Sequence, residues 1–365
     1  MITLIKNRDY KGLALLFFCL LGLVWFFFVK LDLFNKLFYQ SDLFSHIQIS
    51  RTWLEGRPVM HENNYGYHGR LHNYFFDLLM GPAVKAWGGF GIFIIQLLLY
   101  IWALLYTFPY IYSHSKNKFN AGLFYFIIFL GPYAFWLYDD PWFGFHTEML
   151  YIPLGFIFFI SLVRQQAVIS VICGLLMVLV KEDGAVVAAC LHLFHLSARN
   201  SSNAISTRKW LGKSLFWGVF WLVVFIAGII LLKYKNNFGP DRIGKAFKQV
   251  QQDASLSLLQ YLLSIFKSFG LLLLPLAVFI MYLKPLRKVL LWWLLFLVPV
   301  IIVSLVSGFV YFPQLDFSLT WVPRFSMVFT LFLALSAWIL ISGRNGWFSN
   351  PKMAIAGGVT VGIGL

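Results

Sequence analysis

Charged residues are scarce in this sequence, and that scarcity excludes an ordinary soluble fold. Asp, Glu, Lys and Arg make up 12% of the 365 residues, whereas hydrophobic residues make up 60%. Soluble globular proteins carry about twice that charged fraction. The composition therefore predicts an all-α, polytopic membrane protein, a bundle of transmembrane helices in contact with the lipid bilayer.

Cysteine is also rare. The three cysteines, Cys19, Cys173 and Cys190, all lie inside apolar runs, which argues against a disulfide framework, a zinc site or a cysteine nucleophile. His68 and His72 are four residues apart, but they lack the glutamate of an HExxH motif. We therefore predict no metal site and no firm cofactor, while a divalent metal stays an open alternative.

Acidic residues are few: the sequence has 14 Asp and Glu residues and 29 Lys and Arg residues, so the net charge is +15. A basic patch on one face of a domain would suggest a nucleic acid. Here the basic residues sit in short loops between apolar runs, where the positive-inside tendency explains them. We predict no nucleic-acid partner.

Long apolar segments are abundant, and a spanning helix needs about 20 apolar residues. We predict about ten transmembrane helices in a single membrane domain over residues 1–365. The segments are 12–31, 90–112, 121–138, 148–163, 166–180, 184–198, 214–232, 264–283, 289–310 and 325–342. A final apolar run, 353–365, is too short to span, which suggests a C-terminus truncated relative to a longer protein.

Charges in the loops predict a cytoplasmic N-terminus. With that orientation basic residues collect in short inside loops, and every acidic residue except Asp9 falls in an outside loop or at an outside helix end. The apolar stretch from Leu13 to Val29 is not followed by a small-residue cleavage site, so we interpret it as a retained first helix. We expect a multi-pass protein of the inner (cytoplasmic) cell membrane, with its working face extracytoplasmic.

The first outside loop, residues 32–89, is the longest polar stretch. The segment from Asp42 to Glu55 predicts a helix that lies along the membrane and ends at Gly56. Asp42, a candidate catalytic residue, and His46, a candidate for substrate binding, are four apart and share a face. The alternative is that Asp42 only caps the helix. Further substrate-binding candidates in this loop are His68 and Arg70.

The second outside loop is short and dense in ionisable residues. Asp139 and Asp140 are followed by His146 and Glu148, with Trp and Phe between them. Aromatic residues at a membrane boundary are usually only the aromatic belt. Paired aspartates beside a histidine and a glutamate are not explained by such a belt, so all four are candidates for substrate binding.

Lys181, Glu182 and Asp183 interrupt an otherwise apolar stretch from 166 to 198. Each half is too short to cross a bilayer comfortably, and ionisable residues there are costly unless they face protein or water. The pattern predicts a short helix pair that meets at a polar apex, with the three residues in a cavity below the outer surface. The alternative is a self-neutralising Lys–Glu pair that only marks a turn.

Two later segments carry charge at the predicted outer face. Residues 241–266 predict an amphipathic helix in the interface, because apolar residues recur there at a spacing of three to four. Arg324 begins a helix at the outer face, where its guanidinium could hold a phosphate with two hydrogen bonds.

Short motifs in these segments resemble two groups of membrane proteins. The early Asp42, Phe145-His146-Thr147-Glu148 and Lys181-Glu182-Asp183 resemble, in order and spacing, the uncharacterised family called domain of unknown function 2079. A first helix, a large outside loop with Glu-Gly-Arg-Pro and a lysine-centred apex are similar to membrane glycosyltransferases of the C-type fold (GT-C). Their lipid A aminoarabinose transferase and protein mannosyltransferase branches have Lys-Gly-Pro where this chain has Lys-Glu-Asp. The resemblance covers roughly residues 12–340.

The C-type resemblance implies a transferase with a lipid-linked donor. Such enzymes take a sugar from a polyprenyl-phosphate in the outer leaflet and pass it to an acceptor (glycan, lipid or protein) with inversion. The resemblance implies that Asp42 is the general base on the acceptor hydroxyl. It makes Lys181 and Arg324 candidates for the leaving lipid phosphate, and His146 with Glu148 would orient sugar or acceptor.

Two other interpretations stay open. A transporter or flippase for a lipid-linked or polar solute also builds its site from broken helices near a charged apex. The sequence has no clear inverted repeat, and its ionisable residues gather at one face instead of the midplane, which favours an enzyme. The third interpretation is a non-catalytic assembly or sensor protein.

Overall fold

The computed structural model is a helical bundle, and it describes residues 9–39, 41–63, 66–67, 72–130, 144–201, 206–235, 287–309 and 322–342. Its α-helices are α2 (Tyr10–Asn35), α3 (Ser41–Arg51), α4 (Phe75–Trp87), α5 (Phe90–His114), α6 (Lys118–Leu130), α8 (Tyr151–Val163), α9 (Ala167–Val180), α10 (Gly184–Ser201), α11 (Thr207–Lys235), α14 (Arg287–Phe309) and α15 (Val322–Ser342). The short 3-10 helices are η1 (Thr52–Glu55) and η3 (Thr147–Leu150). A two-stranded antiparallel hairpin pairs β1 (His61–Glu62) with β2 (Gly66–Tyr67).

The predicted apolar segments lie in helices wherever the structure describes them. Segment 264–283, the amphipathic stretch 241–266 and the run 353–365 lie outside the described residues. Three helices, Tyr10–Asn35, Phe90–His114 and Thr207–Leu231, are long and apolar enough to cross a membrane. The other apolar helices are shorter, so the count of about ten crossings and the C-type architecture stay predictions.

Helix α8 lies at the centre of the bundle. Every residue from Tyr151 to Ser161 is buried, and the helix packs against α5, α9, α10 and α15. A helix that is apolar on all sides needs such a surrounding. Gly155 lets α15 approach closely, because a Cβ at that position would lie 2.2 Å from Thr330 Cγ2.

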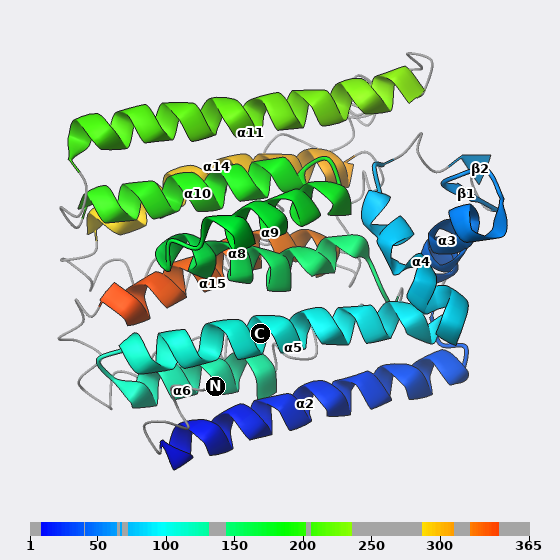
Figure 1. Cartoon of the computed structure of the whole chain (residues 1–365), viewed down its shortest axis with the longest axis horizontal. Coiled ribbons are helices and arrows are strands. Elements are labelled where there is room, and N and C mark those ends of the chain that lie inside the picture. The colour runs from blue at the N-terminus through cyan, green and yellow to red at the C-terminus, as the bar shows by residue number, and fades with distance from the viewer. Residues whose placement is uncertain are drawn as a thin grey trace, which may run out of the picture.

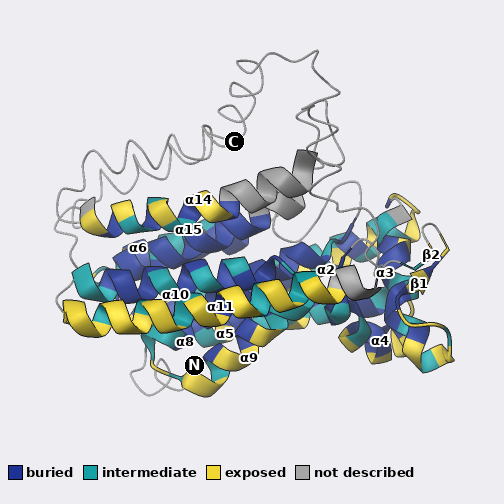
Figure 2. Cartoon of the chain, turned by 90° about the horizontal axis from the view of Figure 1, so that it is seen from above, coloured by how far each residue is buried: buried dark blue, intermediate teal, exposed yellow. Residues whose placement is uncertain are grey.

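Helices α2 and α11 lie on opposite sides of the bundle (Figure 1), and exposed residues recur along α11 (Figure 2). Both helices expose apolar side chains. Phe17 and Trp25 of α2 are exposed, as are Phe216 and Val223 of α11. Soluble monomers rarely expose contiguous apolar surface of this kind. The exposed faces therefore suit contact with lipid tails, as a membrane protein requires.

The first outside loop contains a helix that the sequence analysis did not single out. Helix α4 buries Phe76, Met80 and Val84, which recur every four residues and share one face, and it packs on α3 and α5. The predicted helix from Asp42 to Glu55 is confirmed as α3 continued by η1. It ends at Gly56, whose φ of 66° suits a residue without a Cβ. Much of this polar stretch is therefore folded as helix.

The two ends of the bundle differ in charge. Helices α3 and α4 and the hairpin lie together at one end, here called the α3–α4 end (Figure 1). At the opposite end, the described helix termini and turns carry basic residues: Lys11, Lys116, Lys118, Arg164, Arg199, Arg208, Lys209, Lys213 and Lys288. This is the division that the sequence analysis expected, and which end faces the cytoplasm stays a prediction.

Candidate functional site

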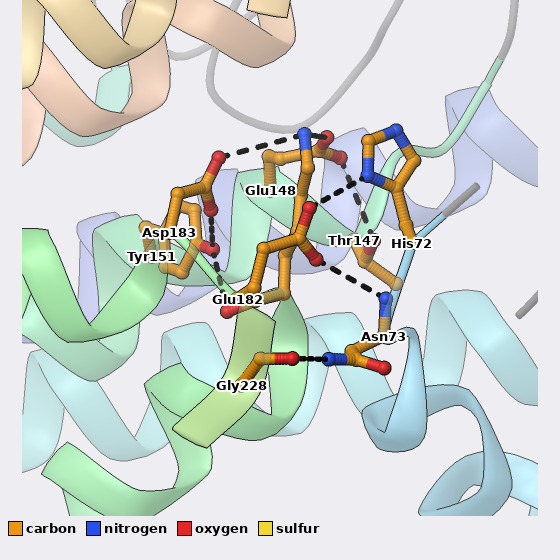
Figure 3. Close-up of polar contacts among 9 residues, drawn as sticks. His72, Asn73, Thr147, Glu148, Tyr151, Glu182, Asp183 and Gly228 are labelled. Atoms are coloured by element: carbon orange, nitrogen blue, oxygen red, sulfur yellow. Dashed lines mark hydrogen bonds and ion pairs between the residues drawn. The ribbon is translucent and has the colours of Figure 1, made fainter. Parts of the chain in front are cut away.

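The apex turn, Lys181 to Asp183, joins α9 to α10 and holds a buried ion cluster (Figure 3). Lys181 Nζ lies 2.9 Å from Glu148 Oε1 of η3 and 3.5 Å from Asp183 Oδ2. The Tyr151 hydroxyl donates a hydrogen bond to Asp183. Lys181 and Asp183 are both 4% exposed. Since the cluster joins the turn to the first turn of central α8, the predicted polar apex is more than a self-contained turn.

Burial and neighbouring charges shift the pKa values of the apex turn. Burial alone would lower the pKa of the Lys181 ammonium, but the carboxylates of Asp183 and Glu148 hold that pKa above its usual range. Burial raises the pKa of Asp183 to about 6, although the Lys181 ammonium acts in the opposite direction. Lys181 therefore stays charged, and a carboxyl group beside it titrates not far below neutral pH.

Glu182 connects the apex turn to the first outside loop and to α11 (Figure 3). Its Oε1 lies 3.0 Å from His72 Nδ1, and its Oε2 accepts a hydrogen bond of 3.1 Å from the Asn73 backbone N–H. The Asn73 side-chain amide donates in turn to the Gly228 carbonyl of α11, at 3.1 Å. Glu182 and Asn73 together thus join three segments that are far apart in sequence.

A second polar pair lies at the same end of the bundle. Asp42 Oδ2 of α3 is 3.5 Å from His146 Nε2. The Asp42 side chain is 37% exposed and that of His146 is 16% exposed. A carboxylate that is partly exposed and contacts an imidazole is suited to take a proton from a substrate hydroxyl.

The segment before η3 brings His146 to this position. Gly144 has a φ of 73°, and a Cβ there would lie 2.6 Å from the Tyr39 ring. Phe145, which follows, is fully buried. Only glycine combines this backbone conformation with such a close approach, so the Gly-Phe-His sequence fixes the direction in which His146 points.

The two polar pairs belong to one region of the molecule. His146 and Glu148 are two residues apart, and two residues of extended chain span at most about 7 Å. His146 contacts Asp42, and Glu148 contacts Lys181. The four residues that the sequence analysis proposed for one reacting centre are therefore brought together.

A third pair, of a histidine and a carboxylate, lies deeper. His46 Nδ1 of α3 is 2.7 Å from Asp77 Oδ2 of α4, and these side chains are 5% and 0% exposed. Beside it, the Ser45 hydroxyl donates to Glu62 of β1 at 3.2 Å. The α3 helix thus carries polar groups that face α4 and the hairpin as well as the second outside loop.

Some predicted site residues lie outside the described part of the chain. These are His68, Arg70, Asp139 and Asp140. Arg324 lies in the first turn of α15, but its side chain is outside the description. Helix α15 packs against η3, which carries Glu148. The predicted cavity around the apex turn stays a prediction.

Sequence reasoning missed several polar residues that the structure places in buried contacts. Asp77 pairs with His46, and Tyr151 bonds to Asp183. In the helices, Lys30 of α2 is 3% exposed and donates to Gln96 of α5 at 2.8 Å. The available signal was an ionisable or amide side chain within an apolar helix, which is costly unless it has a partner.

The chemistry open to this set is proton transfer and hydrogen bonding to hydroxyl groups. Within the described residues, no group of three or more His, Cys, Asp or Glu is arranged to hold a metal ion. The side chains at the α3–α4 end instead form histidine–carboxylate and lysine–carboxylate pairs.

Comparison with family models, with curated proteins and with solved structures gives no match for this chain.

Proposed function

We propose that this chain is an inverting membrane glycosyltransferase of the C-type architecture, related to domain of unknown function 2079. It moves a sugar from a polyprenyl-phosphate donor to an acceptor at the extracytoplasmic face of the cytoplasmic membrane. The observation that carries the proposal is the contact of 3.5 Å between the partly exposed Asp42 carboxylate and His146, next to a cluster of buried carboxylates. General-base catalysis needs a carboxylate within reach of a hydroxyl, and the remaining groups of one reacting centre must lie close by.

Asp42 is the base in this mechanism. Its carboxylate takes the proton of the acceptor hydroxyl while the acceptor oxygen attacks the anomeric carbon from the side opposite the phosphate. The bond between that carbon and the phosphate oxygen breaks, and the polyprenyl phosphate leaves with the electron pair. His146 orients the Asp42 carboxylate through the 3.5 Å contact.

The leaving phosphate is assigned to Arg324 and not to Lys181. Among the described residues around Lys181, the carboxylates of Glu148, Glu182 and Asp183 outnumber the ammonium of Lys181 itself. A phosphate placed there would meet like charges, which disfavour it. Lys181 instead holds Glu148 in place, while Arg324 begins the helix that packs against η3.

Carboxylates and imidazoles at the α3–α4 end are assigned to the sugar and acceptor, whose hydroxyls they can bind. The acceptor class, whether glycan, lipid or protein, is left open. The described residues in this group are His46, Glu148, Glu182 and Asp183. His68, Arg70, Asp139 and Asp140 lie outside the described residues and are assigned to the same ligands from the sequence alone.

A transporter or flippase of a lipid-linked or polar solute is the second candidate. One observation favours it: α9 and α10 are helices of 14 and 18 residues that meet at a charged turn. Transporters build their sites from such interrupted helices, but near the bilayer midplane. Here the turn contacts the first outside loop through Glu182, which favours chemistry at the surface.

The proposal is tested with purified protein and a panel of polyprenyl-phosphate sugars, together with lipid and glycan acceptors. Mass spectrometry should detect free polyprenyl phosphate and a glycosylated acceptor in equal amounts. In proteoliposomes, movement of an unaltered lipid-linked sugar between leaflets without product would favour the flippase and exclude the transferase.

A further inference from the structure

His46, one of the residues assigned to the sugar and acceptor, forms a pair with Asp77 that gives its role a more specific form. His46 lies one helical turn after Asp42 on α3, so the two side chains leave the same face. The imidazole Nδ1 is 2.7 Å from Asp77 Oδ2, and both side chains are almost completely buried. Burying a histidine and a carboxylate together is costly unless their bond has good geometry.

The pairing fixes which ring nitrogen carries the proton. An ionised carboxylate only accepts hydrogen bonds, so the hydrogen shared with Asp77 sits on Nδ1. The neutral ring then has a lone pair on Nε2, on the edge away from Asp77. For the residues that the structure describes, the bond to Asp77 is the one hydrogen bond of the His46 ring. In the neutral ring, Nε2 is therefore a hydrogen-bond acceptor that none of the described residues fills.

Aromatic side chains hold this ring beside the proposed reacting centre. The rings of Tyr74 and Phe145 approach it edge-on, with centroids 5.2 Å and 5.5 Å away. The ring of His146, which contacts Asp42, is 6.3 Å away. The His46 ring therefore lies next to the Asp42–His146 pair, which contains the proposed general base.

We propose that His46 Nε2 binds a hydroxyl of the donor sugar, and that Asp77 is the positioning residue that fixes the His46 tautomer. The sugar as ligand rests on the proposed function, whereas the tautomer does not. A sugar hydroxyl can donate a hydrogen bond to an unprotonated Nε2. A protonated Nε2 cannot accept that hydrogen bond. Exchanging the carboxylate for an amide reverses the tautomer of a histidine in a catalytic triad.

The first measurement is the nitrogen NMR spectrum of the full chain in lipid nanodiscs, with labelled histidine. His46→Gln assigns the resonances. We expect a protonated Nδ1 and an unprotonated Nε2 in the wild type near pH 7.5, and the reverse in Asp77→Asn, whose amide can donate to Nδ1. A protonated Nε2 in the wild type, or an unchanged tautomer in folded Asp77→Asn, would overturn the proposal.

The second measurement titrates a panel of methyl glycosides into the same samples. We expect the Nε2 resonance of the wild type to move, and the affinity to fall by about tenfold or more in Asp77→Asn, as the loss of one hydrogen bond to a charged or polarised group predicts. His61→Gln, which removes an exposed histidine of β1, should leave both unchanged. No movement of Nε2 with any glycoside would overturn the assignment of a sugar hydroxyl.

Both measurements test the His46 site independently of the proposed transferase activity, because neither measurement needs catalysis. If Asp77→Asn does not fold, the wild-type spectrum and titration still decide. If the protein showed the expected tautomer and responded to a glycoside but transferred no sugar, the His46 site would be supported and the transferase activity would be contradicted.

Discussion

At the scale of single residues, the site is built from buried charges that compensate one another. Lys181 is placed between Glu148 and Asp183, and Glu182 turns away to bind the first loop. Removing one member of a buried ion pair leaves the other charge without compensation and costs more than the pair itself contributes. The apex turn should therefore be sensitive to any change of charge.

Replacing Lys181 with methionine leaves two buried carboxylates without their ammonium. We expect the free energy of unfolding to fall by about 3–5 kcal/mol, measured by reversible unfolding in mixed detergent micelles. Lys209→Met removes an exposed lysine at the opposite end and should change the stability by less than about 0.5 kcal/mol. If Lys181→Met were as stable as the wild type, the ion cluster would not hold the turn.

The second prediction at this scale concerns pH. Burial raises the pKa of Asp183 to about 6 in the folded protein, whereas an exposed aspartate titrates near 4. Because the folded pKa is the higher one, protonation stabilises the fold, fully below about pH 4, and this contribution is lost as the pH rises through about 6. The nearby groups are Lys181, Glu182, Glu148 and Tyr151.

Asp183→Asn keeps a neutral acceptor for the Tyr151 hydroxyl and cannot ionise. We therefore expect the melting temperature of the wild type to fall, relative to that of Asp183→Asn, between about pH 4 and about pH 6, and the difference to stay constant at higher pH. Parallel melting curves for both proteins over this range would show that Asp183 does not titrate there.

Single residues also show how far the site could be predicted. Lys181 and its neighbours were recognisable because ionisable side chains interrupt an apolar stretch. Asp77 was not, since its partner His46 is 31 positions away on another helix. Residue spacing identifies which side chains share a face of one helix, but contacts between helices depend on how those helices pack.

At the scale of elements, the turn between α9 and α10 depends on close packing. A Cβ on Gly184 would lie 2.0 Å from the Met177 carbonyl oxygen. The backbones of the two helices therefore approach more closely than any larger residue permits. Small residues give helices in membranes this kind of contact, and here the contact places Lys181 and Asp183 beside η3.

Gly184→Ala should separate α9 from α10, because the obstructing atom is backbone and cannot move aside. We expect the free energy of unfolding to fall by about 1–3 kcal/mol or more. The matched control is Gly218→Ala in α11, where a Cβ would meet nothing within 4 Å. That change should be neutral or slightly stabilising, since alanine favours helix over glycine. Equal effects of the two substitutions would contradict the packing described for the turn.

The elements were easier to predict than the site. Long apolar runs predict their helices directly. The bounds of α2 and α5 lie close to those expected, whereas α11 begins at Thr207, well before its predicted segment 214–232. Helix α4 was not predicted, because it lies within residues 32–89, a segment that was interpreted as a loop on account of its overall polarity. Its signal is the spacing of Phe76, Met80 and Val84, which only a search for helical periodicity inside the loop would have found.

At the scale of the whole molecule, the polar pairs of the candidate site gather at one end of the described bundle. Helices α2 and α11 expose apolar side chains on opposite sides of the bundle, and the buried helix α8 lies between them (Figure 1). The Asp42–His146 pair, the apex turn and the His46–Asp77 pair all lie at the α3–α4 end, opposite the end where Lys116, Lys118 and Arg164 lie. An enzyme that acts on a lipid-linked donor in one leaflet needs this kind of asymmetry.

The most direct test of the account measures sugar transfer by Asp42→Asn, with a donor from the polyprenyl-phosphate panel that the wild type uses. The account predicts a loss of about 10²–10⁴-fold in kcat, the range for removal of a general base, with an unchanged melting temperature. Glu55→Gln, which changes a carboxylate of η1 paired with Arg51 and Arg57, should transfer sugar at the wild-type rate. Unaltered transfer by well-folded Asp42→Asn would contradict the account.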